Sequence, residues 1–188
     1  MPTPNAFRIM MRRFPSPTTG ISIETARLRL RQHRIDDLDA RIKMTGDAET
    51  TRFVGGIQDP EENWNRVLRY AGHWALLGYG IFVVEERSSG RFAGEVGLFE
   101  LQRGLGADFD GFPEAGWMIA GWAAGQGYAS EALAAAIGWH ESNLGPSRMV
   151  CLIDPDNSAS LRVAAKTGFQ PFRDTVYKDH AVILHERL

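Results

Sequence analysis

The 188-residue sequence has a single cysteine, Cys151, so no disulfide can form within the chain. Its cysteine and histidines do not follow the spacing of a zinc site, and we expect no bound metal. No run of apolar residues has the length of a membrane span, and the N-terminal residues lack the apolar segment of a secretion signal. These absences predict a cytoplasmic protein with no membrane partner.

An excess of charge of one sign is also lacking, because 21 Lys and Arg stand against 23 Asp and Glu, for a formal net charge of −2. Nonspecific nucleic-acid binding needs a clustered basic surface, so we expect no nucleic-acid partner. Apolar residues are plentiful at 44% of the chain, which is enough for the core of one domain. We therefore expect a small-molecule or protein partner.

Proline is concentrated near the start of the chain. Pro2, Pro4, Pro15 and Pro17 lie among serines and threonines within the first twenty residues. Such a segment buries little, so we predict a flexible tail over residues 1–20 and a single domain over residues 21–188.

Hydrophobic periodicity predicts a mixed α/β fold. Residues 27–31 alternate between charged and apolar, which is typical of a half-buried strand whose arginines face solvent. The later elements are predicted as a short helix at 36–47, a long helix from Pro60, strands at 79–86, 91–101 and 114–120, a helix ending before Gly145, a strand at 149–153, a helix at 157–167 and final strands within 169–188. Hairpin strands that precede helical crossovers indicate a mixed sheet rather than a doubly wound one.

A glycine-containing loop joins the strand at 114–120 to the helix that follows it. Gly125, Gln126 and Gly127 lie at the start of this helix, where backbone N–H groups and the helix dipole can hold a phosphate. The loop lacks the third glycine of a dinucleotide fingerprint and the Gly-Lys-Ser/Thr ending of a Walker loop. On this motif alone we favour a tight turn, because short glycine patterns have many false positives.

Two further segments make the interpretation of this loop more specific. The chain opens its domain with Glu24 to Arg31, and it carries the pattern Asn157-x-x-Ser160 followed by Lys166-Thr167-Gly168-Phe169. In this order, with the loop between them, the segments resemble the GNAT acetyltransferase superfamily, in particular its RimJ/RimL-like branch of ribosomal-protein N-terminal acetyltransferases. The resemblance implies one acyl-CoA N-acyltransferase domain whose central, mostly antiparallel, twisted sheet is flanked by helices.

The resemblance also implies acetyl-CoA as co-substrate. Its pyrophosphate would lie on the backbone N–H groups of Ala124, Gly125, Gln126, Gly127, Tyr128, Ala129 and Ser130. Ala124 replaces a polar residue of the family pattern, which costs little because the main chain does most of the phosphate binding. The strand residues Met118, Ile119 and Ala120 would pair with the pantetheine, and an N–H group near Ile119 would polarise the thioester carbonyl.

Acetyl transfer requires a neutral amine. An α-amino group, with a pKa of about 8, needs less help from a base than a lysine at about 10.4. Glu95 and Glu114 lie in apolar strand segments, where burial would raise the carboxyl pKa and suit either residue to proton abstraction. We expect Glu95 on the more central strand to be the base, with Glu114 or water alone as alternatives, and a salt bridge as an equally plausible role for Glu95.

The departing thiolate needs a proton or a hydrogen bond. Many members of the superfamily supply it from a tyrosine seven residues after the asparagine, and this chain has Ala164 there. By resemblance, Ser160 is the substitute, while Asn157 contacts the cofactor or an ordered water. Asn157 also suits a helix N-cap, and Tyr177 could act instead if the last strands bring it close.

The acceptor site is predicted at residues 53–57 and in the loop 103–112, with Trp64, His73 and Trp74 as further candidates. Asp108 and Asp110 in that loop would attract a cationic acceptor. The default interpretation is that these loop residues are solvated and that the aromatic side chains lie in the core. The predicted function is N-acetylation of a protein N-terminal α-amine or a small amine by direct attack in a ternary complex. The alternative is a noncatalytic acyl-CoA-binding module. An exposed final strand could pair across a homodimer.

Overall fold

The structure is a computed structural model that describes residues 20–188. The predicted tail at residues 1–20 therefore lies outside the described residues, except for Gly20. No helix within 20–188 is long and apolar enough to cross a membrane. The elements are β1 (Ser22–Glu24), β2 (Leu28–Arg31), η1 (Ile35–Asp37), α2 (Leu38–Thr45), α3 (Ala48–Thr51), α4 (Pro60–Leu77), β3 (Ile81–Glu86), β4 (Phe92–Phe99), β5 (Glu114–Ile119), η2 (Gly121–Ala123), α5 (Tyr128–Leu144), β6 (Met149–Ile153), α6 (Ser158–Lys166), β7 (Gln170–Tyr177) and β8 (His180–Arg187).

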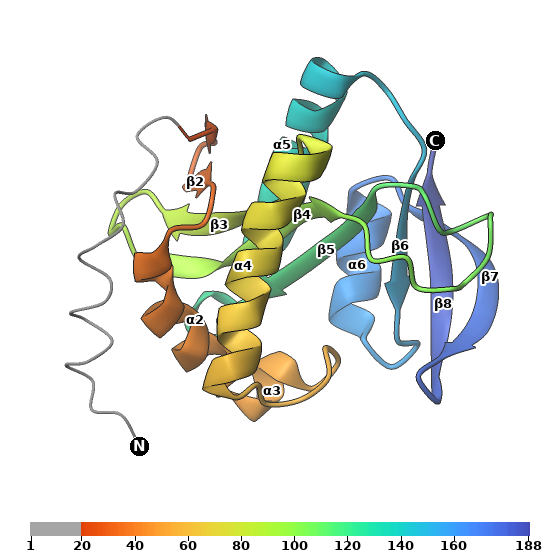
Figure 1. Cartoon of the computed structure of the whole chain (residues 1–188), viewed down its shortest axis with the longest axis horizontal. Coiled ribbons are helices and arrows are strands. Elements are labelled where there is room, and N and C mark those ends of the chain that lie inside the picture. The colour runs from red at the N-terminus through yellow and green to blue at the C-terminus, as the bar shows by residue number, and fades with distance from the viewer. Residues whose placement is uncertain (1–19) are drawn as a thin grey trace.

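The strands form one sheet in the order β1-β2-β3-β4-β5-β6-β8-β7. Every neighbouring pair is antiparallel except β5 and β6, which are parallel. Figure 1 shows α4 crossing one face of the sheet while α5 lies behind it. The predicted mixed, mostly antiparallel sheet flanked by helices is confirmed.

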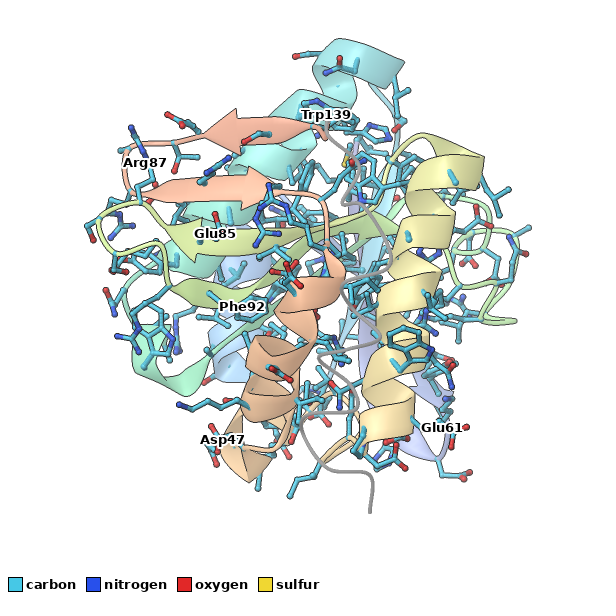
Figure 2. All side chains as sticks on the ribbon, turned by 60° about the vertical axis from the view of Figure 1, so that its left-hand side comes forward. Asp47, Glu61, Glu85, Arg87, Phe92 and Trp139 are labelled. Atoms are coloured by element: carbon cyan, nitrogen blue, oxygen red, sulfur yellow. The ribbon has the colours of Figure 1, made fainter. Side chains whose placement is uncertain are left out.

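The helices keep their places because each buries an apolar stripe. Ala132, Leu133, Ala136 and Ile137 recur at helical spacing on α5 and are buried in the main core cluster. Trp139, labelled in Figure 2, lies one turn further along and packs edge-on against Trp74 of α4 and Phe82 of β3. The core thus fixes α4 and α5 on the sheet.

The parallel strands β5 and β6 pair at one position only. Glu114 is opposite Val150, and the Val150 N–H group donates to the Pro113 carbonyl over 3.0 Å. Beyond this point the strands run apart (Figure 1), so the rest of the β5 edge on this side lacks a partner strand. The sheet therefore opens into a split next to β5, which positions the candidate site.

The structure differs from the sequence-based prediction at the edges of the sheet. Ser22–Glu24 forms an extra strand, because Thr25 N–H and the Leu28 carbonyl close a turn before β2. Arg31, predicted to face solvent, is buried by ion pairs with Asp37 and with Glu85, which Figure 2 labels on β3. The final strand β8 lies inside the sheet between β6 and β7, so it is not the exposed edge expected for a homodimer.

Candidate active site

The loop before α5 presents unused backbone donors. Gly127 is the N-cap with φ +79, and no side chain caps the helix. Among the described residues, the N–H groups of Gly125 through Ser130 find no acceptor. The loop residues Ala124 to Gly127 are exposed, and Gly127 adopts a left-handed conformation that suits glycine. Free N–H groups at a helix N-terminus fit a phosphate or pyrophosphate group.

The opening segment of the domain holds this loop in place. Glu131, in the first turn of α5, accepts hydrogen bonds from the Thr25 hydroxyl (2.6 Å), the Arg27 backbone N–H (3.0 Å) and the Arg27 Nε (2.7 Å). Arg27 also donates to the Gln126 carbonyl over 2.8 Å and lies over the Tyr128 ring. The family-like opening Glu24 to Arg31 thus supports the loop, a role that sequence reasoning missed.

The unpaired edge of β5 lies in the split. Ala120 N–H donates to the Ala93 carbonyl over 2.9 Å, so it points toward β4. Because the direction of backbone groups alternates along a strand, those of Ile119 point to the open side. Met118 lines the cavity at this edge. Of the three predicted pantetheine contacts, Ile119 has its backbone groups free and Ala120 has its N–H occupied.

Helix α6 provides the opposite wall of the split. Asn157 is its N-cap, and the Asn157 side-chain oxygen accepts from the Ser160 backbone N–H over 3.0 Å. Ser160 Oγ in turn accepts from the indole Nε1 of Trp117 on β5 over 3.1 Å. Both residues line the cavity, whereas Ala164 is fully buried in the core and does not. The capping role considered for Asn157 is therefore present, and the Ser160 hydroxyl is fixed beside the split.

A cavity of about 740 Å³ begins at this split. It brings together Glu95 of β4, Met118 of β5, the α6 N-cap Asn157 and Ser160 of α6. Residues 53–56 and Tyr177 line it as well, in agreement with two of the predictions. The loop residues 124–130 lie outside the cavity lining. The site therefore has a loop of free N–H groups and a separate chamber that contains the candidate base.

Glu95 is buried in the chamber among polar partners. Its Oε1 atom lies 2.9 Å from His33 Nε2 and 2.9 Å from Arg41 Nε, and the Tyr70 hydroxyl is 3.4 Å from Oε2. Burial by itself raises the pKa of a carboxyl group. Here the hydrogen bond and electrostatic effect of His33, with the charges of Arg41 and Arg66, outweigh burial and lower the pKa of Glu95. The expectation of a raised pKa is wrong for Glu95, and its expected ion pair is present.

Glu114 is held differently. Arg103 donates to both of its carboxylate oxygens, over 2.6 and 2.7 Å. Burial raises the pKa of Glu114 despite this partner, as expected from its strand. Arg103 binds both oxygens of Glu114, so a proton taken up by this carboxylate would weaken an existing ion pair. Glu95, whose Oε2 has only a long contact from Tyr70, is the better placed of the two carboxylates.

The expected acidic wall is not part of the cavity. Asp108 pairs with Arg173 over 2.8 Å, and Asp110 accepts from the backbone N–H groups of Gly104 and Gly106. Both carboxylates serve the loop itself, and neither lines the cavity. The prediction that they attract a cationic acceptor is wrong, because local backbone donors and an arginine from β7 already use them.

The aromatic candidates of α4 also lie elsewhere. The Trp74 indole donates to the Ile81 carbonyl over 3.1 Å and packs in the core, and His73 Nε2 lies 2.9 Å from the Glu100 carbonyl. Trp64, His73 and Trp74 do not line the cavity. Tyr70 on the same helix does, and sequence reasoning missed it together with His33 and Arg41.

Comparison with known proteins agrees with this architecture. The model of the acetyltransferase (GNAT) domain matches residues 27–170. The protein YkkB of Bacillus subtilis strain 168 is 30% identical over 151 residues, which covers 75% of this chain and 80% of that one. A structure from Bordetella pertussis, assigned to the GNAT family of acetyltransferases, is 30% identical with a TM-score of 0.81 and covers 89% of this chain and 99% of that one.

The fold is shared more widely. The structure of RimL, a ribosomal L7/L12 α-N-protein acetyltransferase in complex with coenzyme A, has a TM-score of 0.74 at 18% identity, over 89% of this chain and 98% of that one. At this identity the likeness concerns the fold alone. With the family model matching most of the described residues, the chain belongs to the GNAT acetyltransferase family.

Proposed function

We propose that this protein is an acetyl-CoA-dependent N-acetyltransferase that acts on a primary amine by direct attack within a ternary complex. One observation supports this most strongly: the split beside β5 leads from a loop of free N–H groups to a cavity that contains a buried, ion-paired glutamate and a serine hydroxyl. The proposed site of action is the cytoplasm. The finding that no helix of residues 20–188 could span a membrane is compatible with it.

The donor-binding residues are proposed from the geometry of the loop and the split. The N–H groups of Gly125 to Ser130 suit the pyrophosphate, and the Ile119 backbone suits the pantetheine and the thioester oxygen. Met118, Asn157 and Ser160 line the end of the cavity next to this edge. The thioester, when bound, supplies an acyl carbon that is open to attack.

Glu95 is proposed as the general base. Its lowered pKa keeps the carboxylate ionised near neutral pH, so it can accept a proton at any pH where the acceptor amine is present in its neutral form. The amine nitrogen forms a bond to the acyl carbon, and its proton passes to Glu95 directly or through a water. Arg41 and His33 position the carboxylate and are proposed as positioning residues.

Ser160 is proposed to assist the leaving group. Its Oγ atom already accepts from Trp117 Nε1, and its backbone N–H donates to Asn157. The hydroxyl hydrogen is therefore available to donate into the cavity, where the sulfur departs with the electrons of the broken bond to carbon. Tyr177 lines the same cavity and is the second candidate for this role.

A calorimetric titration with acetyl-CoA, followed by a thiol-release assay with amine acceptors, tests the proposal. We expect micromolar binding, which corresponds to about −8 kcal/mol, and release of coenzyme A that depends on an added amine. Glu95→Gln and Ser160→Ala should slow transfer at least tenfold while leaving acetyl-CoA binding nearly unchanged. Binding without transfer to any amine would instead favour a noncatalytic acyl-CoA-binding module, and no binding at millimolar acetyl-CoA would refute the donor assignment.

A further inference from the structure

The cavity carries an excess of positive charge. Six arginine and lysine side chains line it against three carboxylates, although the chain as a whole has a formal net charge of −2. The cations come from α2, the C-cap of α3, α4, the segment between β4 and β5, and the β7–β8 turn. Cations from separate elements thus converge on one cavity, with Arg52, Arg69 and Lys178 at its solvent-exposed rim and Arg41 and Arg103 more deeply buried.

Two of the three carboxylates are already neutralised. Glu95 pairs with Arg41, and Glu114 pairs with Arg103. The third, Asp154, accepts a hydrogen bond from the Asp156 backbone N–H over 2.8 Å. The remaining cations therefore face the cavity without a matching set of protein anions.

These remaining cations are Arg52, Arg66, Arg69 and Lys178. Within residues 20–188, none of the four forms an ion pair or donates a hydrogen bond to the protein. Arg52 lies over the Phe53 ring and Lys178 over the Tyr177 ring, which orients them without neutralising their charge. Four guanidinium and ammonium groups are thus available to a ligand.

A buried donor in the same cavity also lacks a partner. Arg41 is fully buried, and its Nη1 atom donates to Gln58 and Asn63, but its Nη2 atom has no partner among the described residues. Leaving a buried charged donor unsatisfied is costly unless a ligand or water completes it. Arg41 lines the cavity next to Glu95, so this donor is an independent sign of an acceptor atom missing from the chamber.

Helix α4 places two of the free arginines near the candidate base. Arg66, Arg69 and Tyr70 are three and four residues apart, so they share one face of the helix. Tyr70 contacts Glu95, and Arg66 acts electrostatically on both of these residues. Burial and the neighbouring charges of Arg66, Arg103 and Arg41 lower the pKa of Arg69. Such repulsion within one cavity is relieved by an anion.

The donor pyrophosphate does not account for the positive charge of the cavity. The free N–H groups that suit the pyrophosphate belong to residues 125–130, because the Ala124 N–H, also expected to bind it, donates to the Gly121 carbonyl over 3.2 Å; none of these residues lines the cavity. The free cations lie on α4, at the end of α3 and in the β7–β8 turn, elements other than the loop and α5. The anion that they fit is therefore distinct from the donor pyrophosphate.

We propose that the acceptor is a primary amine that carries a carboxylate or phosphate group a few bonds from the nitrogen. This inference rests on the proposed acetyl transfer. The amine binds beside Glu95 and the anionic group binds Arg66 and Arg69, with Arg52 and Lys178 closing the cavity around it. The same positive charge disfavours the ammonium form of the acceptor, so it also promotes loss of the proton before attack. Small amines that carry such a carboxylate or phosphate group share this chemistry with peptides whose first residue is acidic.

Matched acceptor pairs that differ in charge test the proposal. We choose β-alanine with β-alaninamide, phosphoethanolamine with ethanolamine, and the peptide amides Asp-Ala-Ala and Asn-Ala-Ala. For each pair, kcat/KM is measured and corrected for the fraction of neutral amine. The anionic member of at least one pair should be preferred by about tenfold to a hundredfold, as expected for charge-assisted hydrogen bonds. The pair with the largest preference distinguishes a free small molecule from a peptide.

Variants then assign the preference to the cavity. The double variant R66Q/R69Q should reduce it to about threefold or less through a higher KM for the anionic acceptor, and should shift the pH profile to higher pH. R66K/R69K should restore most of the preference. Arg29→Gln removes an exposed arginine of β2 outside the cavity and should change neither value. Binding of acetyl-CoA should be unchanged in all variants, and a tenfold loss of it in R66Q/R69Q would overturn the inference.

The two proposals can fail separately. If neutral or cationic amines are acetylated with the same kcat/KM as anionic ones, the inference is wrong and the proposed function stands. If no amine is acetylated although acetyl-CoA binds, the proposed function is wrong, and calorimetry with phosphoethanolamine and β-alanine decides the inference. Binding by the wild-type protein that is lost in R66Q/R69Q would uphold an anion-selective cavity, and no binding by the wild type would overturn it.

Discussion

The indole Nε1 of Trp117 donates a hydrogen bond to Ser160 Oγ over 3.1 Å, which links β5 to α6 across the split in the sheet. The Ser160 backbone N–H is already bound to the Asn157 side chain. Two neighbours therefore fix the position of this serine, which lines the cavity and whose hydroxyl donates to no acceptor among residues 20–188. A hydroxyl held in this way can act on a leaving group without first reorienting.

Replacing this hydroxyl should slow acetyl transfer. We expect Ser160→Ala to lower kcat about tenfold or more, because the departing thiolate loses its hydrogen-bond donor. The dissociation constant for acetyl-CoA, measured by calorimetry, should change by less than about threefold. Trp117→Phe keeps the hydroxyl and removes only its orienting donor, so its effect on kcat should be smaller.

Ser158→Ala is the matched control, because Ser158 is exposed at the start of α6 and does not line the cavity. It should leave kcat unchanged. Equal rates for Ser160→Ala, Ser158→Ala and the wild type would show that Ser160 has no part in transfer, and Tyr177 would then be the candidate to test.

The pH dependence of transfer should report the acceptor amine rather than Glu95. His33, Arg41 and Arg66 lower the pKa of Glu95 below its ordinary value, so the carboxylate stays ionised as the pH falls from 9 to 6. The rate should therefore rise with pH as the amine, with a pKa of about 8 for an α-amine, loses its proton. Glu95→Gln should lower the rate about a hundredfold across this range without moving the midpoint.

Glu114→Gln is the control for this experiment, because it makes the same change in a buried strand carboxylate that Arg103 already occupies. Its kcat should stay within about threefold of the wild type. A wild-type profile with an additional midpoint near neutral pH that vanishes in Glu95→Gln would mean that Glu95 is protonated in the working enzyme, against the prediction.

The contacts of Thr25 and Arg27, between β1 and β2, with the loop before α5 can be tested through the affinity for acetyl-CoA. Glu131→Gln weakens the acceptor that holds both Thr25 and Arg27, and Arg27→Gln frees the Gln126 carbonyl. Either change should raise the dissociation constant for acetyl-CoA about fivefold to tenfold, because a looser loop must be ordered on binding. The value of kcat at saturating acetyl-CoA should change little.

Arg29 is the matched control for Arg27, since it lies two residues further along on β2, is exposed and does not contact the loop. Unchanged affinity in both Glu131→Gln and Arg27→Gln would mean that the loop holds its shape without the opening segment.

The parts of the site that sequence could predict are local ones. Gly125 and Gly127 lie two residues apart just before α5, and Asn157 and Ser160 lie at the N-cap and in the first turn of α6, so short motifs identify both pairs. The ionisation of Glu95 could not be predicted in this way. It depends on His33 and Arg41, which are 62 and more than 50 residues away in sequence and meet Glu95 only after the helices pack on the sheet.

The positive charge of the cavity could not be predicted from short motifs either. Asp108 and Asp110 stand out in the sequence as an acidic pair, yet they bind their own loop and Arg173. The basic groups that do face the cavity are spread from Arg41 to Lys178 and form no single sequence cluster. The net positive charge of the cavity arises only when the sheet and the helices that cover it have folded.

The close approach of β4 and β5 gives a prediction for stability. Gly94 has φ +155, and a Cβ atom there would overlap the Met118 carbonyl oxygen and lie 2.9 Å from Ile119 Cα. These are backbone atoms of the strand edge proposed to bind the donor, so they cannot move aside without separating the strands. Gly94→Ala should lower the free energy of unfolding by about 2 kcal/mol or more, measured by urea denaturation.

Gly138→Ala is the contrasting substitution, because Gly138 is exposed within α5 and a Cβ there meets nothing within 4 Å. Alanine stabilises a helix interior relative to glycine, so this variant should gain about 0.5 to 1 kcal/mol. A loss of stability in Gly138→Ala, or none in Gly94→Ala, would contradict the packing of β4 against β5 and of α5 against the sheet.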